Sequence, residues 1–465
     1  MKVAALALLG GCHIAFGIEH QDPLPVQVDA AGPREPIQGL VRLVEMRNDA
    51  SFRPTTRSRF YTPFEMQVFV AADDGGTLAI EYHADTGTFA APRSAGRTRI
   101  QLRFGTLIHE YQWDAPVLSL DQVATNRLDA AQAAPGTTLV GQITSTLPSQ
   151  LTTVNVTGVW TRILPIFDAA GFHTPWTGPL PSSSANDQML LAGYDLTAAG
   201  NTMLDQVATV APIEMTSGTN TLAKLALSPA PVTGCVHAIA DLAGDAARLE
   251  AAYPAIGGGP TSQSMNVFST PLLELGPNIL WLLTQAVGRA NATLDYSNVF
   301  PGAKELVTAA VSRPTVFPDG LQAAVATFSF EPRGAPTCGT PITLIAHDVA
   351  IATGFSIDGR ALDADHVPIS LSSTTSTLAW HADGTADLFE VVIYDVTGAT
   401  TLVPHVLHTR APSVVLDRSD FVSGHRYLFS VTTTVGLSAA SDGDLTQRSY
   451  PSQLADGLSP IIDVQ

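Results

Sequence analysis

Apolar and polar residues alternate with a period of two in several parts of the chain, and this pattern restricts the fold most. In a β-strand successive side chains point to opposite faces, so such alternation predicts strands with one buried face. A hairpin is predicted where two alternating runs flank the turn-forming sequence at positions 73–76. Its inward residues are Phe64, Met66, Val68 and Val70 on one strand, and Leu78, Ile80 and Tyr82 on the other.

The composition favours the same fold class. Charged residues make up only 14% of the 465 residues, whereas Gly and Pro number 37 and 32, as expected for many short strands joined by turns. A chain of this length holds several domains. We therefore predict an all-β protein built of tandem β-sandwiches. The formal net charge of −18 argues against nucleic acid as a partner, because phosphate binding needs clustered basic residues.

Shifts in composition and one short internal repeat suggest the module boundaries. The hexapeptide Leu120 to Thr125 recurs unchanged as Leu204 to Thr209, 84 residues later, a spacing close to the length of one sandwich. We expect two related modules that begin near residues 116 and 200. The predicted division is 1–12 signal, 13–36 Pro-rich tether, 37–115 sandwich, 116–199 sandwich, 200–340 sandwich with insertions, and 341–465 final module.

The final module resembles the fibronectin type III family. Trp380 lies on its expected second strand, and Phe389, Val391 and Ile393 alternate along the third. Phe421 stands six residues before Tyr427, the spacing of a tyrosine corner, in which a phenol hydroxyl bonds back to the main chain. The departures are Phe421, where Leu is usual, and Ser423, where Pro is usual. The resemblance implies a spacer or protein-binding module without catalysis. With it, the expected fold class is all-β, with tandem immunoglobulin-like and fibronectin type III-like β-sandwiches.

The first twelve residues resemble the signal of a bacterial lipoprotein. A basic residue, Lys2, precedes the apolar run from Val3 to Leu9, which is too short to span a bilayer. Leu9-Gly10-Gly11-Cys12 matches the lipobox pattern, and the resemblance implies lipidation of Cys12, with palmitate among the acyl chains. It further implies a cell-envelope protein, anchored in the outer membrane and facing the periplasm or the cell surface. The alternatives are an ordinary cleaved signal, with the protein secreted, or an incidental cysteine.

Three groups of residues are candidates for contacts or cross-links. Arg97, Arg99 and Arg103 share one parity of a predicted strand. They form either a patch for anionic lipid or polysaccharide, or a solvated face paired with local acids. Trp176 lies in a Pro- and Gly-rich stretch and either contacts a glycan or partner, or folds down to cover the end of a sandwich. Cys235 and Cys338 form either a disulfide or two separate buried thiols.

Catalytic motifs and metal-ligand spacings do not stand out in this sequence. His405 and His408 form H-x-x-H, which we interpret as exposed loop histidines rather than metal ligands. Asp387 and Glu390 are not assigned as a glycosidase pair, because that requires a separation across a cleft. We predict no catalytic residue, cofactor or metal.

We expect a non-enzymatic envelope lipoprotein that displays sandwich modules. Its partners would be the membrane, through the lipid, and an envelope polysaccharide or protein. The alternative is an accessory or carbohydrate-active component, secreted or lipid-anchored, with its site in the middle modules.

Overall fold

The protein is nearly all β, as predicted, and the computed structural model describes most of residues 35–465. One α-helix occurs among the described residues. No helix in the described part of the chain is long and apolar enough to cross a membrane. The segments left out within that range are 73–75, 95, 125–126, 128, 146–150, 158–160, 164–165, 169–170, 197–200, 254–260, 271–279, 287–290, 297–303, 318–319, 333–340, 345–347, 372–373 and 399–401.

The first module is a sandwich whose core includes Val41, Phe89, Ile100 and Trp113. Its last strand runs parallel to its first, with Gln38 opposite Val117. The strand that follows the predicted boundary at 116 therefore pairs with β1, and Leu118 and Leu120 pack into this core. The strands are β1 (Ile37–Asn48), β2 (Pro54–Arg59), β3 (Gln67–Ala71), β4 (Thr77–Ile80), β5 (Tyr82–His83), β6 (Thr88–Ala91), β7 (Thr98–Phe104), β8 (Leu107–Trp113) and β9 (Val117–Ala124).

The predicted hairpin of this module forms, since β3 pairs with β4 from Val68 opposite Ile80 to Ala71 opposite Thr77. Met66 and Val68 are buried as expected. Phe64 and Leu78, assigned to the same buried face, are instead exposed. Phe64 lies in the turn before β3, where strand parity no longer applies, and β4 lies at the edge of its sheet.

The second module has its own core, which includes Leu139, Val156, Trp176 and Leu227. The predicted boundary at 200 falls between β16 and β17, which are adjacent antiparallel strands. The elements are β10 (Thr138–Gly141), β11 (Ile143–Ser145), β12 (Leu151–Thr157), β13 (Thr161–Ile163), β14 (Ile166–Asp168), β15 (Gly171–Pro175), η1 (Ser183–Ala185), β16 (Gln188–Leu196), β17 (Asn201–Val210), β18 (Thr219–Thr221) and β19 (Leu225–Pro229).

The repeated hexapeptide does not mark equivalent starting points of two modules. Leu120 to Ala124 of its first copy lie in β9, which pairs with β1, and its second copy lies in β17, which pairs with β16. Leu120 and Leu204 are both buried. The two copies therefore share the strand conformation but have different neighbours.

The third module carries the α-helix against its sheets. Asp241 caps the helix by accepting a hydrogen bond from the Gly244 N–H at 3.0 Å. The elements are β20 (Gly234–Ala240), α1 (Leu242–Ala252), β21 (Ser262–Thr270), β22 (Leu280–Ala286), β23 (Asn291–Tyr296), β24 (Lys304–Val316), β25 (Gln322–Pro332) and β26 (Ile342–Leu344).

The fourth module places β28–β27–β30–β33 in one sheet, while β32, β31, β34 and β35 are neighbours in another. Trp380, Phe389 and Val391 are buried in its core. The elements are β27 (Ile351–Ile357), β28 (Arg360–Ala361), β29 (Val367–Ile369), β30 (Thr375–Asp383), β31 (Leu388–Asp395), β32 (Leu402–Thr409), β33 (Ser413–Asp417), η3 (Arg418–Asp420), β34 (Arg426–Val435), η4 (Ala440–Asp442), β35 (Ser452–Leu458) and β36 (Ile462–Val464).

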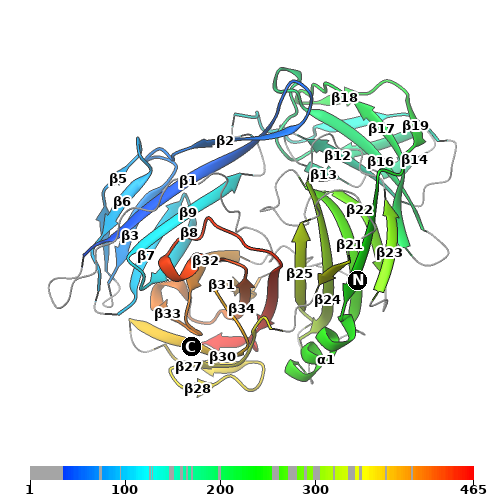
Figure 1. Cartoon of the computed structure of the whole chain (residues 1–465). Helices are drawn as coiled ribbons and strands as arrows, with labels where there is room; N and C mark the ends of the chain where they lie inside the picture. The colour runs from blue at the N-terminus through cyan, green and yellow to red at the C-terminus, as the bar shows by residue number, and fades with distance from the viewer. Residues whose placement is uncertain are drawn as a thin grey trace.

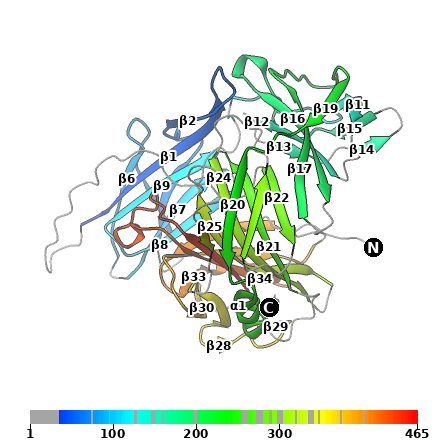
Figure 2. The same ribbon diagram turned by 45° about the vertical axis from the view of Figure 1, so that its right-hand side comes forward.

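The four modules form a closed arrangement rather than a string (Figures 1 and 2). One 20-stranded sheet runs through all of them. It passes from the first module to the fourth through β8 and β32, from the fourth to the third through β35 and β25, and from the third to the second through β22 and β17. The β1–β2 hairpin then reaches the second module, where the Asn48 side chain donates to the Asn186 carbonyl at 2.9 Å.

The hydrogen bond expected of a tyrosine corner is present, since the Val422 N–H donates to the Tyr427 hydroxyl oxygen at 2.8 Å. Tyr427→Phe should lower the free energy of unfolding by about 0.5–1.5 kcal/mol, because the part-buried Val422 N–H loses its acceptor. The test is the denaturant midpoint of the full chain, followed by the near-ultraviolet signal of aromatic packing. A midpoint equal to that of the wild type would show that water replaces the phenol.

Candidate functional site

The described residues concentrate their buried charged groups where the first and fourth modules meet. At this junction β8 and β32 pair in parallel, from His405 opposite Ile108 to Thr409 opposite Gln112. Glu110, His405 and His408 are all nearly inaccessible to solvent. Burying charged groups costs free energy unless partners compensate them, and such groups often mark functional sites. This junction is therefore the candidate functional site.

Arg99 is the centre of one side of the junction. Its guanidinium donates to both carboxylate oxygens of Glu110, at 2.8 and 3.1 Å, and to Asp417 of the fourth module at 2.8 Å. Glu110 also accepts hydrogen bonds from the amides of Gln101 and Gln112. Burial by itself would lower the pKa of Arg99, but the two carboxylates more than offset it and raise that pKa.

The predicted basic patch is therefore wrong. Arg99 is only 3% exposed, and Arg97 donates to the Thr409 hydroxyl at 2.8 Å and to the Ser413 carbonyl at 2.5 Å. Burial lowers the pKa of Arg97. Arg103 lies over the Phe69 ring at 4.0 Å and donates to Gln101. Strand parity correctly gave these residues one face, but it could not show that another module covers that face.

The interpretation of His405 and His408 as exposed loop residues is also wrong, because both lie buried on β32. Three positions apart on a strand, they point to opposite faces. His405 Nδ1 lies 2.9 Å from Asp420, and despite its burial this carboxylate raises the pKa of His405. In the part of the chain that the structure describes, no group of three His, Cys, Asp or Glu residues could hold a metal ion.

His408 begins a row of residues across one face of the shared sheet. In the strand registers, His408 is opposite Tyr111 on β8 and opposite Glu390 on β31. Glu390 is opposite Thr432 on β34, and Thr432 is opposite Asp456 on β35. Directly opposed residues share a face of the sheet, so five strands contribute to one transverse row.

Neighbouring members of this row are in close contact. The Tyr111 ring stacks on His408 with centroids 4.4 Å apart, and His109 Nδ1 lies 3.1 Å from His408 Nε2. His408 Nδ1 lies 3.9 Å from Glu390 Oε2 and has no hydrogen-bond partner. At the far end, the Thr432 hydroxyl donates to Asp456 at 2.8 Å.

The two carboxyl groups of the row are held in an unfavourable setting. Burial, together with the nearby charge of Asp456, raises the pKa of Glu390 to about 7. Burial also raises the pKa of Asp456 to about 6, although Thr432 opposes this shift. Burial lowers the pKa of His408, as do the charges of the other two histidines. From the sequence, Glu390 was not assigned a catalytic role with Asp387. No pattern of residues near Asp456 indicates that it belongs to a site.

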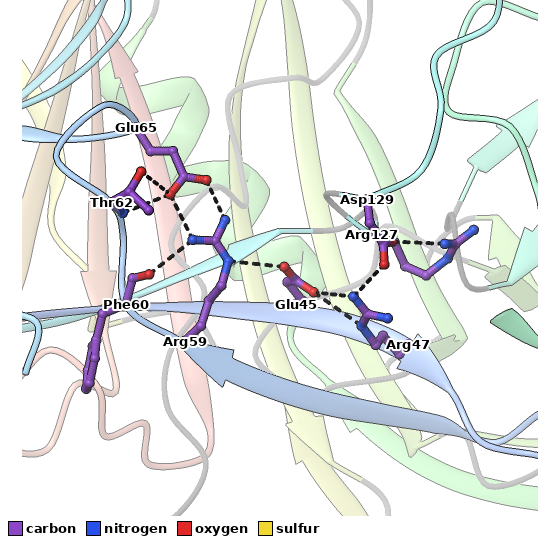
Figure 3. A network of polar contacts seen from close by, with 8 residues as sticks. All are labelled: Glu45, Arg47, Arg59, Phe60, Thr62, Glu65, Arg127 and Asp129. Atoms are coloured by element: carbon purple, nitrogen blue, oxygen red, sulfur yellow. Dashed lines mark hydrogen bonds and ion pairs between the residues drawn. The ribbon is translucent and has the colours of Figure 1, made fainter. Parts of the chain in front are cut away.

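A second polar network closes the arrangement at the β1–β2 hairpin (Figure 3). It alternates acidic and basic side chains, so that each charge lies between opposite charges. Hydrogen bonds from Arg59 lower the pKa of Glu65 to about 2. Its members, in spatial order, are Glu65, Arg59, Glu45, Arg47, Asp129 and Arg127, and Arg127 also bonds Asp187 of the second module at 2.7 Å.

The remaining candidate residues do not join either network. Trp176 is 1% exposed in the core of the second module, and its indole N–H donates to the Pro179 carbonyl at 3.0 Å. It is therefore not the exposed glycan contact that was considered. Cys235 lies half-buried on β20, whereas Cys338 and Cys12 lie outside the described residues. The disulfide and the lipidation stay predictions.

Comparison with known proteins shows no family. No family model matches the chain, and no curated protein matches it. Among solved structures, the Bacillus anthracis TIE protein is 9% identical over 81% of this chain and 64% of its own, with a TM-score of 0.13. The native conformation of E. coli alpha-2-macroglobulin is 9% identical over 87% of this chain and 27% of its own, also with a TM-score of 0.13. Similarities this weak support no conclusion about the fold or the function of this protein.

Arg99→Met should lower the free energy of unfolding by about 3–5 kcal/mol, because it leaves buried carboxylates without their cation. Arg99→Met combined with Glu110→Leu should cost less than the sum of the two single changes. Denaturant midpoints of the full chain measure both effects. Arg103→Met, on the same strand and face, is the matched control and should change stability little. Strict additivity in the double variant would contradict the coupling.

Glu390→Gln should stabilise the protein increasingly as pH rises. The raised pKa of Glu390 means that the folded state favours the protonated carboxyl. Its contribution to stability is full below the unfolded pKa of about 4.5 and is lost as pH rises through about 7. The loss amounts to about 3 kcal/mol. Melting temperatures of variant and wild type should coincide near pH 4.5 and diverge by pH 8. Asp363→Asn, at an exposed carboxylate, should show no such divergence.

Proposed function

We propose that this protein is a non-enzymatic lipoprotein of the bacterial cell envelope that presents its sandwich modules as one rigid scaffold to a polysaccharide or protein. The observation that carries the scaffold is the continuous sheet through all four modules, reinforced by the buried Arg99–Glu110–Asp417 contact. Modules joined by flexible linkers would move independently. Shared strand pairing and a buried ion pair fix their relative orientation.

We further infer that the fourth module is a fibronectin type III-like domain. The supporting observations are its two facing sheets, the buried Trp380, and the hydrogen bond between Val422 and Tyr427. In this setting β32 lies at the edge of its module's own sheet and is available to pair with β8. The module would therefore work as a connecting element of the scaffold.

The anchoring is proposed from the sequence of the first twelve residues. After lipidation of Cys12, residues 13–36 would tether the scaffold to the outer membrane. Each buried CH₂ of an acyl chain contributes about 0.8 kcal/mol, so a multiply acylated cysteine holds the protein durably. A disulfide between Cys235 and Cys338 would further restrain the third module, and mass spectrometry of the exported protein would reveal it.

Metabolic labelling with an alkyne analogue of palmitate tests the anchor. The wild type should incorporate the label, and Cys12→Ser should not, because the thiol is the acceptor of the lipid. Cys235→Ser is the matched control and should label like the wild type. An unlabelled wild type, recovered from the medium, would overturn the anchor and favour a secreted protein.

The enzymatic alternative is tested on envelope polysaccharides in the same purified protein. A binding scaffold should retard in affinity gels that contain the polysaccharide, without releasing new reducing ends. Catalytic release of reducing ends would favour the carbohydrate-active alternative. Retardation in the affinity gel does not depend on lipidation. The scaffold proposal and the anchor proposal are therefore tested independently.

A further inference from the structure

Glu390 and Asp456 differ from the other carboxylates at the module junction, because within the described residues neither forms an ion pair with an arginine or lysine. Glu110 and Asp417 bind Arg99, and Asp420 binds His405. By contrast, Glu390 faces His408 across 3.9 Å, and Asp456 lies two strands away. A second carboxylate makes ionisation harder, so the fold retains this pair at a cost in stability.

The pair shares a face with an unsatisfied histidine. Opposed positions on neighbouring strands place Glu390, Thr432 and Asp456 in line, with about 10 Å between the outer two Cα atoms. His408 is 3% exposed, and its Nδ1 atom, which lacks a hydrogen-bond partner, faces Glu390 across 3.9 Å. That distance is too long for a direct hydrogen bond but admits a nitrogen about 2.8 Å from each atom.

The hydrogen-bond inventory points to a donor with several hydrogens. When His408 Nε2–H donates to His109 Nδ1 across their 3.1 Å contact, His408 Nδ1 is left as an acceptor. Together with the carboxylates of Glu390 and Asp456 it makes three acceptors and no donor. A primary ammonium group has three donors and no acceptor. It would also supply the missing positive charge, next to the Tyr111 ring that stacks on His408.

Of the three groups, Asp456 lies nearest to solvent. Asp456 is partly exposed, whereas Glu390 is 8% exposed and His408 lies deeper. A ligand would therefore meet Asp456 first and Glu390 next. The net charge of −18 favours the approach of a cation over that of an anion.

We propose that Glu390, Asp456 and His408 form a binding site for a primary ammonium group, carried by a small amine or by an amine of the scaffold's partner. The site does not depend on the lipid anchor. The proposed scaffold function does not specify which chemical group the protein recognises, and this site would recognise an ammonium group. Protonation of Glu390 or Asp456 removes the attraction, and protonation of His408 or His109 repels the ligand.

The test uses n-butylammonium as the probe and n-butanol as its neutral counterpart, with ligand-observed saturation-transfer NMR on the full chain at pH 8 and low salt. n-Butylammonium should bind saturably, and n-butanol should not. Glu390→Gln and Asp456→Asn should each weaken binding at least tenfold. Binding should also disappear at pH 5, where the two carboxyl groups are protonated.

Asp363→Asn is the matched control and should bind n-butylammonium like the wild type. Circular dichroism verifies that each variant is folded, and Glu390→Gln is expected to be more stable than the wild type at this pH. Three results would overturn the site: no saturable binding by the wild type at pH 8, equal binding of n-butanol, or unchanged affinity in both carboxylate variants. Polysaccharide retardation in affinity gels is scored separately, so either proposal can fail alone.

Discussion

The parallel pairing of β8 with β32 is the contact on which the closed arrangement depends. It joins strands from the first and fourth modules into one sheet, and it buries the faces on which Arg99, Glu110, His405 and His408 lie. Without this pairing these groups would be solvated, and the two modules would have independent edges. The pairing supplies backbone hydrogen bonds, while the charged side chains fix which residues are opposite one another.

The two ends of the arrangement use polar contacts differently. At the β8–β32 junction, Arg99 is enclosed and bonded to two carboxylates, so loss of one partner leaves a buried charge. At the β1–β2 hairpin, the ion pairs of Arg47 with Asp129 and of Arg59 with Glu65 are partly exposed and are screened by salt. Only at its end, where Arg127 binds Asp187 of the second module, does this network contain an ion pair buried on both sides.

Local patterns in the sequence were sufficient to predict the fold class and several strands. Period-two alternation located β3, β4 and β7, and the spacing of Phe421 and Tyr427 anticipated the hydrogen bond to Val422. These features depend on neighbouring residues or on one turn. The partners of β9 and β17 could not be predicted in this way, because local composition does not reveal which strands pair.

The candidate site was beyond the sequence for a related reason. Glu390 and Asp456 are 66 positions apart and meet only through the registers of β31, β34 and β35. The face that carries Arg99 looked solvent-facing because alternation distinguishes two faces but not what covers them. His408 was predicted to lie in an exposed loop, because the sequence does not show that its strand pairs with β8 and that Tyr111 covers it. Long-range register, rather than residue type, created the site.

The pairing of β8 with β32 also sets the order of events in folding. Ile108 must find His405, nearly three hundred residues later in the chain. Until the fourth module is made, β8 has an open edge with unsatisfied N–H and C=O groups, which is a template for pairing with other chains. Such long loop closure slows folding and prolongs that exposure. The order of synthesis therefore affects assembly. The first module is synthesised first, but its strand β8 can pair only after β32 of the fourth module has been synthesised.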